Sequence, residues 1–216
     1  MRNRAFVTTA LCLALAGCGG ASDETALTVL EKEARRAEQV AAMDDWQRLF
    51  AAPERTIAYA NQFGYNARPY AAIDGGAGFG STGIDSPLSD TGAEAPNSTG
   101  FAASGAQADQ IDQLRFTLAI TDPGDAAVAK QRFADIVAGF LSYYGYEDAA
   151  AVRRNIAAEA SARDELGQAV LAYDKEPIAG EAVEARRLIV TISRNGATAP
   201  ATQEPEAQGT EDGNRR

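Results

Sequence analysis

The side chains that could perform chemistry in this chain are almost all carboxylates. The 216 residues include 30 acidic and 20 basic side chains, two cysteines and no histidine. Without histidine, the sequence excludes the common catalytic triads, histidine-ligated zinc and the most frequent general base. Catalysis would depend on paired acids, as in glycoside hydrolysis, but no acid lies in a distinctive motif.

The neighbouring acids are better explained by structure than by catalysis. Asp122 precedes Pro123 and suits a helix N-cap better than a calcium ligand. No lysine follows a serine at the three-residue spacing of serine-lysine enzymes. We therefore predict no catalytic residue, no cofactor and no metal site. The other acids, which we expect to be caps or surface charges, are Asp44, Asp45, Asp109, Asp112, Glu147 and Asp148.

Cys18 is the residue whose surroundings indicate a defined modification. Arg2 and Arg4 precede an apolar run, residues 5–16, that is too short to span a bilayer. The run leads into Leu15-Ala16-Gly17-Cys18, which resembles the lipobox of bacterial lipoproteins. The resemblance implies that residues 1–17 are a signal peptide and that lipid on Cys18 is a membrane anchor.

The same resemblance predicts a location and a charge. Gly19 replaces the aspartate that retains lipoproteins in the inner membrane, which favours the outer membrane over the inner membrane, facing the periplasm. Cys12 leaves with the signal peptide and Cys18 carries lipid, so no disulfide forms. Loss of the two leader arginines leaves 18 basic and 30 acidic residues, a net charge of −12. Nucleic acid is therefore not an expected partner.

Residues 18–24 are a short spacer, and residues 25–70 are predicted to be a helical segment. From Thr25 to Phe50 there is no Gly or Pro, and apolar residues recur at three- and four-residue steps. We favour packing of this helix on its own domain over self-association in a coiled coil. Pro53 then begins a second helix that ends at Gly64. Aromatic residues near the second helix are expected to pack on the first rather than to bind a ligand: Tyr59, Phe63, Tyr65 and Tyr70.

Residues 71–109 change to a composition rich in Gly, Ser and Ala, which predicts a disordered linker. Gly78 to Gly83 match the Gly-x-Gly-x-x-Gly string of dinucleotide-binding loops. Such a loop needs a strand before it and a helix after it, and neither is indicated here. We therefore reject a dinucleotide site.

Residues 110–195 indicate an α+β module in the order strand, helix, helix, strand, strand. The predicted elements are a strand over 114–120, helices over 123–144 and 147–162, and strands over 168–174 and 186–194. The last two strands are consistent with an antiparallel hairpin. We expect a three-stranded antiparallel sheet with the helices on one face, followed by a disordered acidic tail over 196–216.

The tyrosines at the end of the first predicted helix of the module are candidates for a partner surface. Tyr143, Tyr144 and Tyr146 cannot all point inward, so Tyr143 and Tyr146 could contact an envelope protein or the cell wall. With the anchor, this predicts a non-enzymatic binding or structural module of the cell envelope. The alternatives are a carboxylate-dependent hydrolase acting on envelope glycans and a helical oligomeric scaffold.

Overall fold

The structure is a computed structural model that describes residues 28–88, 92, 94–181 and 183–197. The predicted signal peptide, with Cys18, and the spacer lie outside the described residues, as does nearly all of the predicted acidic tail. The chain separates into two compact units, residues 1–38 and 39–216.

Helices precede the sheet, as predicted for residues 25–70, but the first predicted helix is divided in two. They are α1 (Val29–Ala42), α2 (Asp45–Ala51) and α3 (Pro53–Asn61). The break falls at Asp44, whose side chain accepts a hydrogen bond of 2.7 Å from the Gln47 amide and caps α2. Such a cap satisfies an amide that has no partner within the helix, so the chain begins a new helix here.

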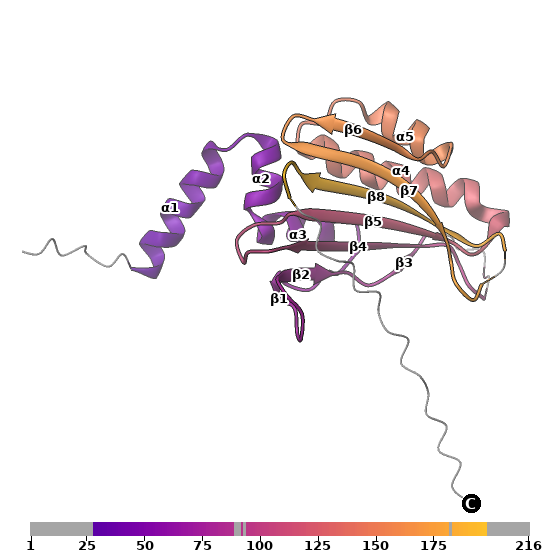
Figure 1. The fold of residues 1–216 in the computed structure, drawn as a ribbon, viewed down its shortest axis with the longest axis horizontal. Helices are drawn as coiled ribbons and strands as arrows, with labels where there is room; N and C mark the ends of the chain where they lie inside the picture. The colour runs from indigo at the N-terminus through magenta and orange to yellow at the C-terminus, as the bar shows by residue number, and fades with distance from the viewer. Residues whose placement is uncertain (1–27, 89–91, 93, 182, 198–216) are drawn as a thin grey trace, which may run out of the picture. The chain divides into compact units, whose positions relative to one another are not determined.

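The sheet is antiparallel and has eight strands in the order β1-β2-β4-β5-β8-β7-β6, with β3 also paired to β4 (Figure 1). The α+β prediction is confirmed, but the prediction of three strands is wrong because the sheet is larger. The bounds are β1 (Ala71–Ala72), β2 (Phe79–Thr82), β3 (Ser86–Pro87), β4 (Ser98–Gly105), β5 (Gln113–Ile120), β6 (Ala162–Leu166), β7 (Ala169–Pro177) and β8 (Arg186–Arg194).

The additional strands lie mainly in residues 71–109, which the sequence predicted to be a disordered linker. That prediction is wrong for β1 to β4. The apolar contacts of β4 come from its neighbour, since Phe101 lies directly opposite Phe116 of β5 and both are buried. Small residues let β4 lie close to neighbouring segments of the same chain, so the low hydrophobicity of β4 does not prevent its burial. The Gly78–Gly83 string contributes to β2, and the element that follows it is the strand β3 rather than a helix.

Two helices and a short 3₁₀ turn connect β5 to β6. The turn is η1 (Pro123–Asp125), and the helices are α4 (Ala126–Tyr143) and α5 (Ala149–Ala157). The predicted Asp122 cap is present, because its side chain accepts a 3.0 Å hydrogen bond from the Gly124 amide. The second helix ends earlier than predicted, and β6 follows it as an edge strand.

The main core lies between the helices and one face of the sheet. On β5 the buried residues alternate with half-buried residues, as a strand with one buried face requires. The buried ones are Leu114, Phe116, Leu118 and Ile120. Tyr65, between α3 and β1, is fully buried, and its ring contacts Phe101. The N-terminal residues of the second unit therefore belong to the same core as the sheet.

Candidate functional site

An aromatic surface lies where α2 and α3 meet the C-terminal end of α4. We define it as five partly or largely exposed side chains: Trp46, Tyr59, Phe63, Tyr143 and Tyr146. Tyr143 is 60 % exposed, yet its ring stacks on Tyr59 with centroids 3.9 Å apart and an interplanar angle of 21°. An exposed side chain held in this way loses little freedom when a partner binds.

The end of α4 explains why its tyrosines point in different directions. Tyr144 is buried, and its hydroxyl lies 3.2 Å from the Thr56 hydroxyl of α3. Gly145, with φ of 77°, then ends the helix in a conformation that favours glycine. Tyr143 is consequently left exposed before Tyr144, and Tyr146 is half-buried after it.

Trp46 and Phe63, the other two rings of the surface, each contact one of its tyrosines. Trp46 and Tyr146 meet edge to face at 6.5 Å, and Phe63 meets Tyr59 edge to face at 5.6 Å. Burial, with a smaller contribution from Tyr143, raises the pKa of Tyr59, and burial also raises the pKa of Tyr146. Both phenols are therefore neutral hydrogen-bonding groups at ordinary pH.

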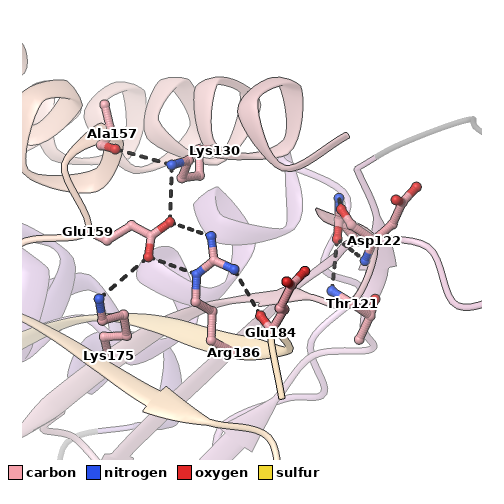
Figure 2. A network of polar contacts seen from close by, with 9 residues as sticks. Thr121, Asp122, Lys130, Ala157, Glu159, Lys175, Glu184 and Arg186 are labelled. Carbon is pink, nitrogen blue, oxygen red and sulfur yellow. Dashed lines mark hydrogen bonds and ion pairs between the residues drawn. The ribbon is translucent and has the colours of Figure 1, made fainter. Parts of the chain in front are cut away.

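A second cluster, which the sequence did not indicate, is centred on Glu159 just after α5 (Figure 2). Arg186 of β8 binds both carboxylate oxygens, through Nε at 2.8 Å and Nη2 at 2.6 Å. Lys130 of α4 donates to the same carboxylate at 3.1 Å, and the Lys175 ammonium of β7 lies 3.6 Å away. This single side chain therefore connects two helices to two strands.

The backbone of Glu159 is unusual for its residue type. Its φ is 50°, in the left-handed region where glycine is favoured. The Glu159 amide donates to the Ile156 carbonyl and the Ala160 amide donates to the Asn155 carbonyl, the pattern of a Schellman helix end. Glu159 thus occupies the position that glycine usually takes, and its ion pairs offset the strain.

Two carboxylates with little exposure, Asp112 and Glu159, do not form a hydrolytic pair. The side chains of Asp112 and Glu159 are 10 % and 14 % exposed, and each pairs with arginine, Asp112 with Arg194 at 2.6 Å. Hydrogen bonding to Arg186, with a smaller contribution from Lys130, lowers the pKa of Glu159 to about 2. A general acid needs a raised pKa, so Glu159 does not suit the hydrolase alternative, and Asp112 is held in an ion pair with arginine.

Other acids singled out from the sequence have structural contacts. Asp148 caps α5 by accepting a 2.8 Å hydrogen bond from the Ala151 amide, and Asp45 pairs with Arg48. Within the described ranges, no group of three or more acidic or cysteine side chains could hold a metal ion. In the same part of the chain, no helix combines the length and apolar character needed to cross a bilayer.

Comparison with known proteins places the chain in a family. Residues 75–212 match DUF6030, a family of unknown function. The chain belongs to this family. Neither the curated proteins nor the solved structures include a match to it.

The family match contains the whole Glu159 cluster but only part of the aromatic surface. All members of the Glu159 cluster lie within residues 75–212, as do Tyr143 and Tyr146. Trp46 and Tyr59 lie before the match, on α2 and α3. The aromatic surface therefore combines DUF6030 residues with residues contributed by the preceding helices.

Proposed function

We propose that this protein is a lipoprotein held in the membrane by lipid on Cys18, facing the periplasm, with the outer membrane favoured. Its folded domain acts as a non-enzymatic binding or structural module that contacts another component of the cell envelope. The lipobox-like Leu15–Cys18 string supports the anchor. Tyr143, exposed but stacked on Tyr59, is the observation that supports a contact surface.

This proposal is consistent with the charges of the described residues. The pKa of Glu159 is lowered and Asp112 is paired, so these side chains stabilise the fold rather than supply a proton. The aromatic rings pack against one another and against the core, and Tyr143 among them remains 60 % exposed. Exposed tyrosine and tryptophan are typical of contact surfaces.

Photo-crosslinking in intact cells tests the proposed contact. A crosslinking amino acid at position 143 should form an adduct with an envelope component, and the adduct should be lost in Cys18→Ser. Position 84 is the control, because Ile84 is 58 % exposed and Tyr143 is 60 % exposed. Recovery of the monomer alone at position 143, with no association with the cell wall or membrane, would contradict the proposal.

A further inference from the structure

We infer that the partner of the aromatic surface is the lipid headgroup region of the same membrane that holds Cys18. This inference rests on the proposed anchor and names the chemistry that the surface recognises. Indole and phenol rings combine an apolar body with a polar group, and such side chains concentrate at membrane-water interfaces. Four of the five members of the aromatic surface are tyrosine or tryptophan.

The charges beside the aromatic surface favour neutral headgroups. Asp45 pairs with Arg48 and Asp148 lies 3.9 Å from Arg154, but Asp164 also acts on the Tyr146 phenol, so acidic charge is in excess beside this ring. None of the three lysines of the chain belongs to the surface. The net charge of −12 expected for the chain that begins at Cys18 also opposes binding to anionic lipid. Zwitterionic headgroups therefore fit this surface better than anionic ones.

The proposed anchor would allow the aromatic surface to stay bound to lipid even if its own affinity for lipid is weak. Trp46 follows Cys18 by 28 residues. With α1 helical and the rest extended, this connection spans at most about 70 Å. A lipid on Cys18 therefore keeps the aromatic surface near the bilayer at an effective concentration in the millimolar range, where even low intrinsic affinity suffices.

The sequence provides its own probe for this contact. Trp46 is the single tryptophan of the chain, and it contacts Tyr146 within the aromatic surface. Its fluorescence therefore reports on this surface alone. Bromine atoms on lipid acyl chains quench only those indole groups that reach the bilayer.

The experiment uses the full lipidated protein in phosphatidylcholine vesicles with brominated or ordinary acyl chains. We expect brominated lipid to quench Trp46 and ordinary lipid to shift its emission to shorter wavelength. Tyr143→Ser and Tyr59→Ser should lose most of the quenching, because they remove the stacked pair. Ile84→Ser, which changes an equally exposed apolar residue outside the surface, should retain it.

The results separate this inference from the anchor itself. If the protein floats with the vesicles but Trp46 is not quenched, the anchor stands and the headgroup contact is wrong. Equal quenching in all variants would also overturn the contact, as would a Trp46 response to isolated cell-wall glycan in place of lipid. If the wild-type protein does not float with vesicles, both the anchor and the contact are wrong.

Discussion

Replacing Glu159 by glutamine tests the role assigned to the charged cluster. The carboxylate has a pKa lowered from 4.5 to about 2 by Arg186 and Lys130. At about 1.4 kcal/mol per unit, this shift corresponds to about 3 kcal/mol of stability at pH 7. Little of this is screened by water, because the side chain is 14 % exposed. Glu159→Gln should therefore lower the free energy of unfolding by about 2 to 3 kcal/mol.

Glu159→Gly separates the ion pairs from the backbone strain. Glycine loses the same carboxylate but accepts the φ of 50° at this helix end without strain. It should therefore be more stable than Glu159→Gln by about 1 kcal/mol. Glu165→Gln is the control, because Glu165 is exposed and makes no ion pair among the residues that the structure describes. It should change stability by less than about 0.5 kcal/mol.

Urea unfolding at several pH values checks both variants. A lowered folded-state pKa means that the carboxylate stabilises the fold fully above pH 4.5 and that this stability is lost as the pH falls towards 2. The difference between wild type and Glu159→Gln should be largest at neutral pH and should shrink over that interval. The reasoning is refuted if Glu159→Gln equals the control at pH 7, or if the difference does not change with pH.

Three further predictions concern the packing of the domain. A fragment limited to residues 75–212 should not unfold cooperatively in circular dichroism, whereas residues 39–197 should unfold cooperatively. The shorter fragment lacks the buried side chains of α2 and α3, and equal cooperativity of the two fragments would contradict this prediction. Gly105→Ala should cost about 1 to 3 kcal/mol in chemical denaturation, since its Cβ would overlap the Gln110 carbonyl oxygen and lie 2.5 Å from the Tyr70 hydroxyl, and an unchanged midpoint would be inconsistent with these contacts. Asp112→Ala should cost about 2 kcal/mol by leaving both Arg194 and the Ala106 amide without their carboxylate partner, a loss that Arg194→Met in the same background should not increase.

The sequence predicted best the elements whose own side chains carry the core. The alternation on β5 and β8 indicated strands, and both are present, with β8 at the predicted bounds. The β7-β8 hairpin is likewise antiparallel as expected. In these elements the hydrophobic period is set by the strand itself, so a local pattern is sufficient.

The strands that were missed depend on their neighbours. β4 contains mostly small residues, and β6 reads Ala-Arg-Asp-Glu-Leu. Charges on β6 suit an edge strand, where they oppose pairing with other chains, but they weaken the alternation that marks a strand. The break before α2 did have a local signal, because Asp44 followed three residues later by Gln47 resembles a capping box.

The two clusters differ in how much of them a sequence can indicate. Tyr143 and Tyr146 were identifiable because adjacent tyrosines at a helix end cannot all be buried. Glu159 was not, since Lys130 lies 29 residues before it and Arg186 lies 27 residues after it. Only the fold brings these partners together, and nothing in the local sequence distinguishes Glu159 from a surface glutamate.

Mass spectrometry of the N-terminal peptide tests the central claim most directly. The protein would be extracted with detergent from membranes of cells that express the full chain. We predict a peptide that begins at Cys18 and carries the mass of a diacylglyceryl group and an amide-linked acyl chain, with Cys18→Ser protein absent from the membrane fraction. An unmodified Cys18, or a Cys18→Ser protein that remains in the membrane fraction, would contradict the lipid anchor.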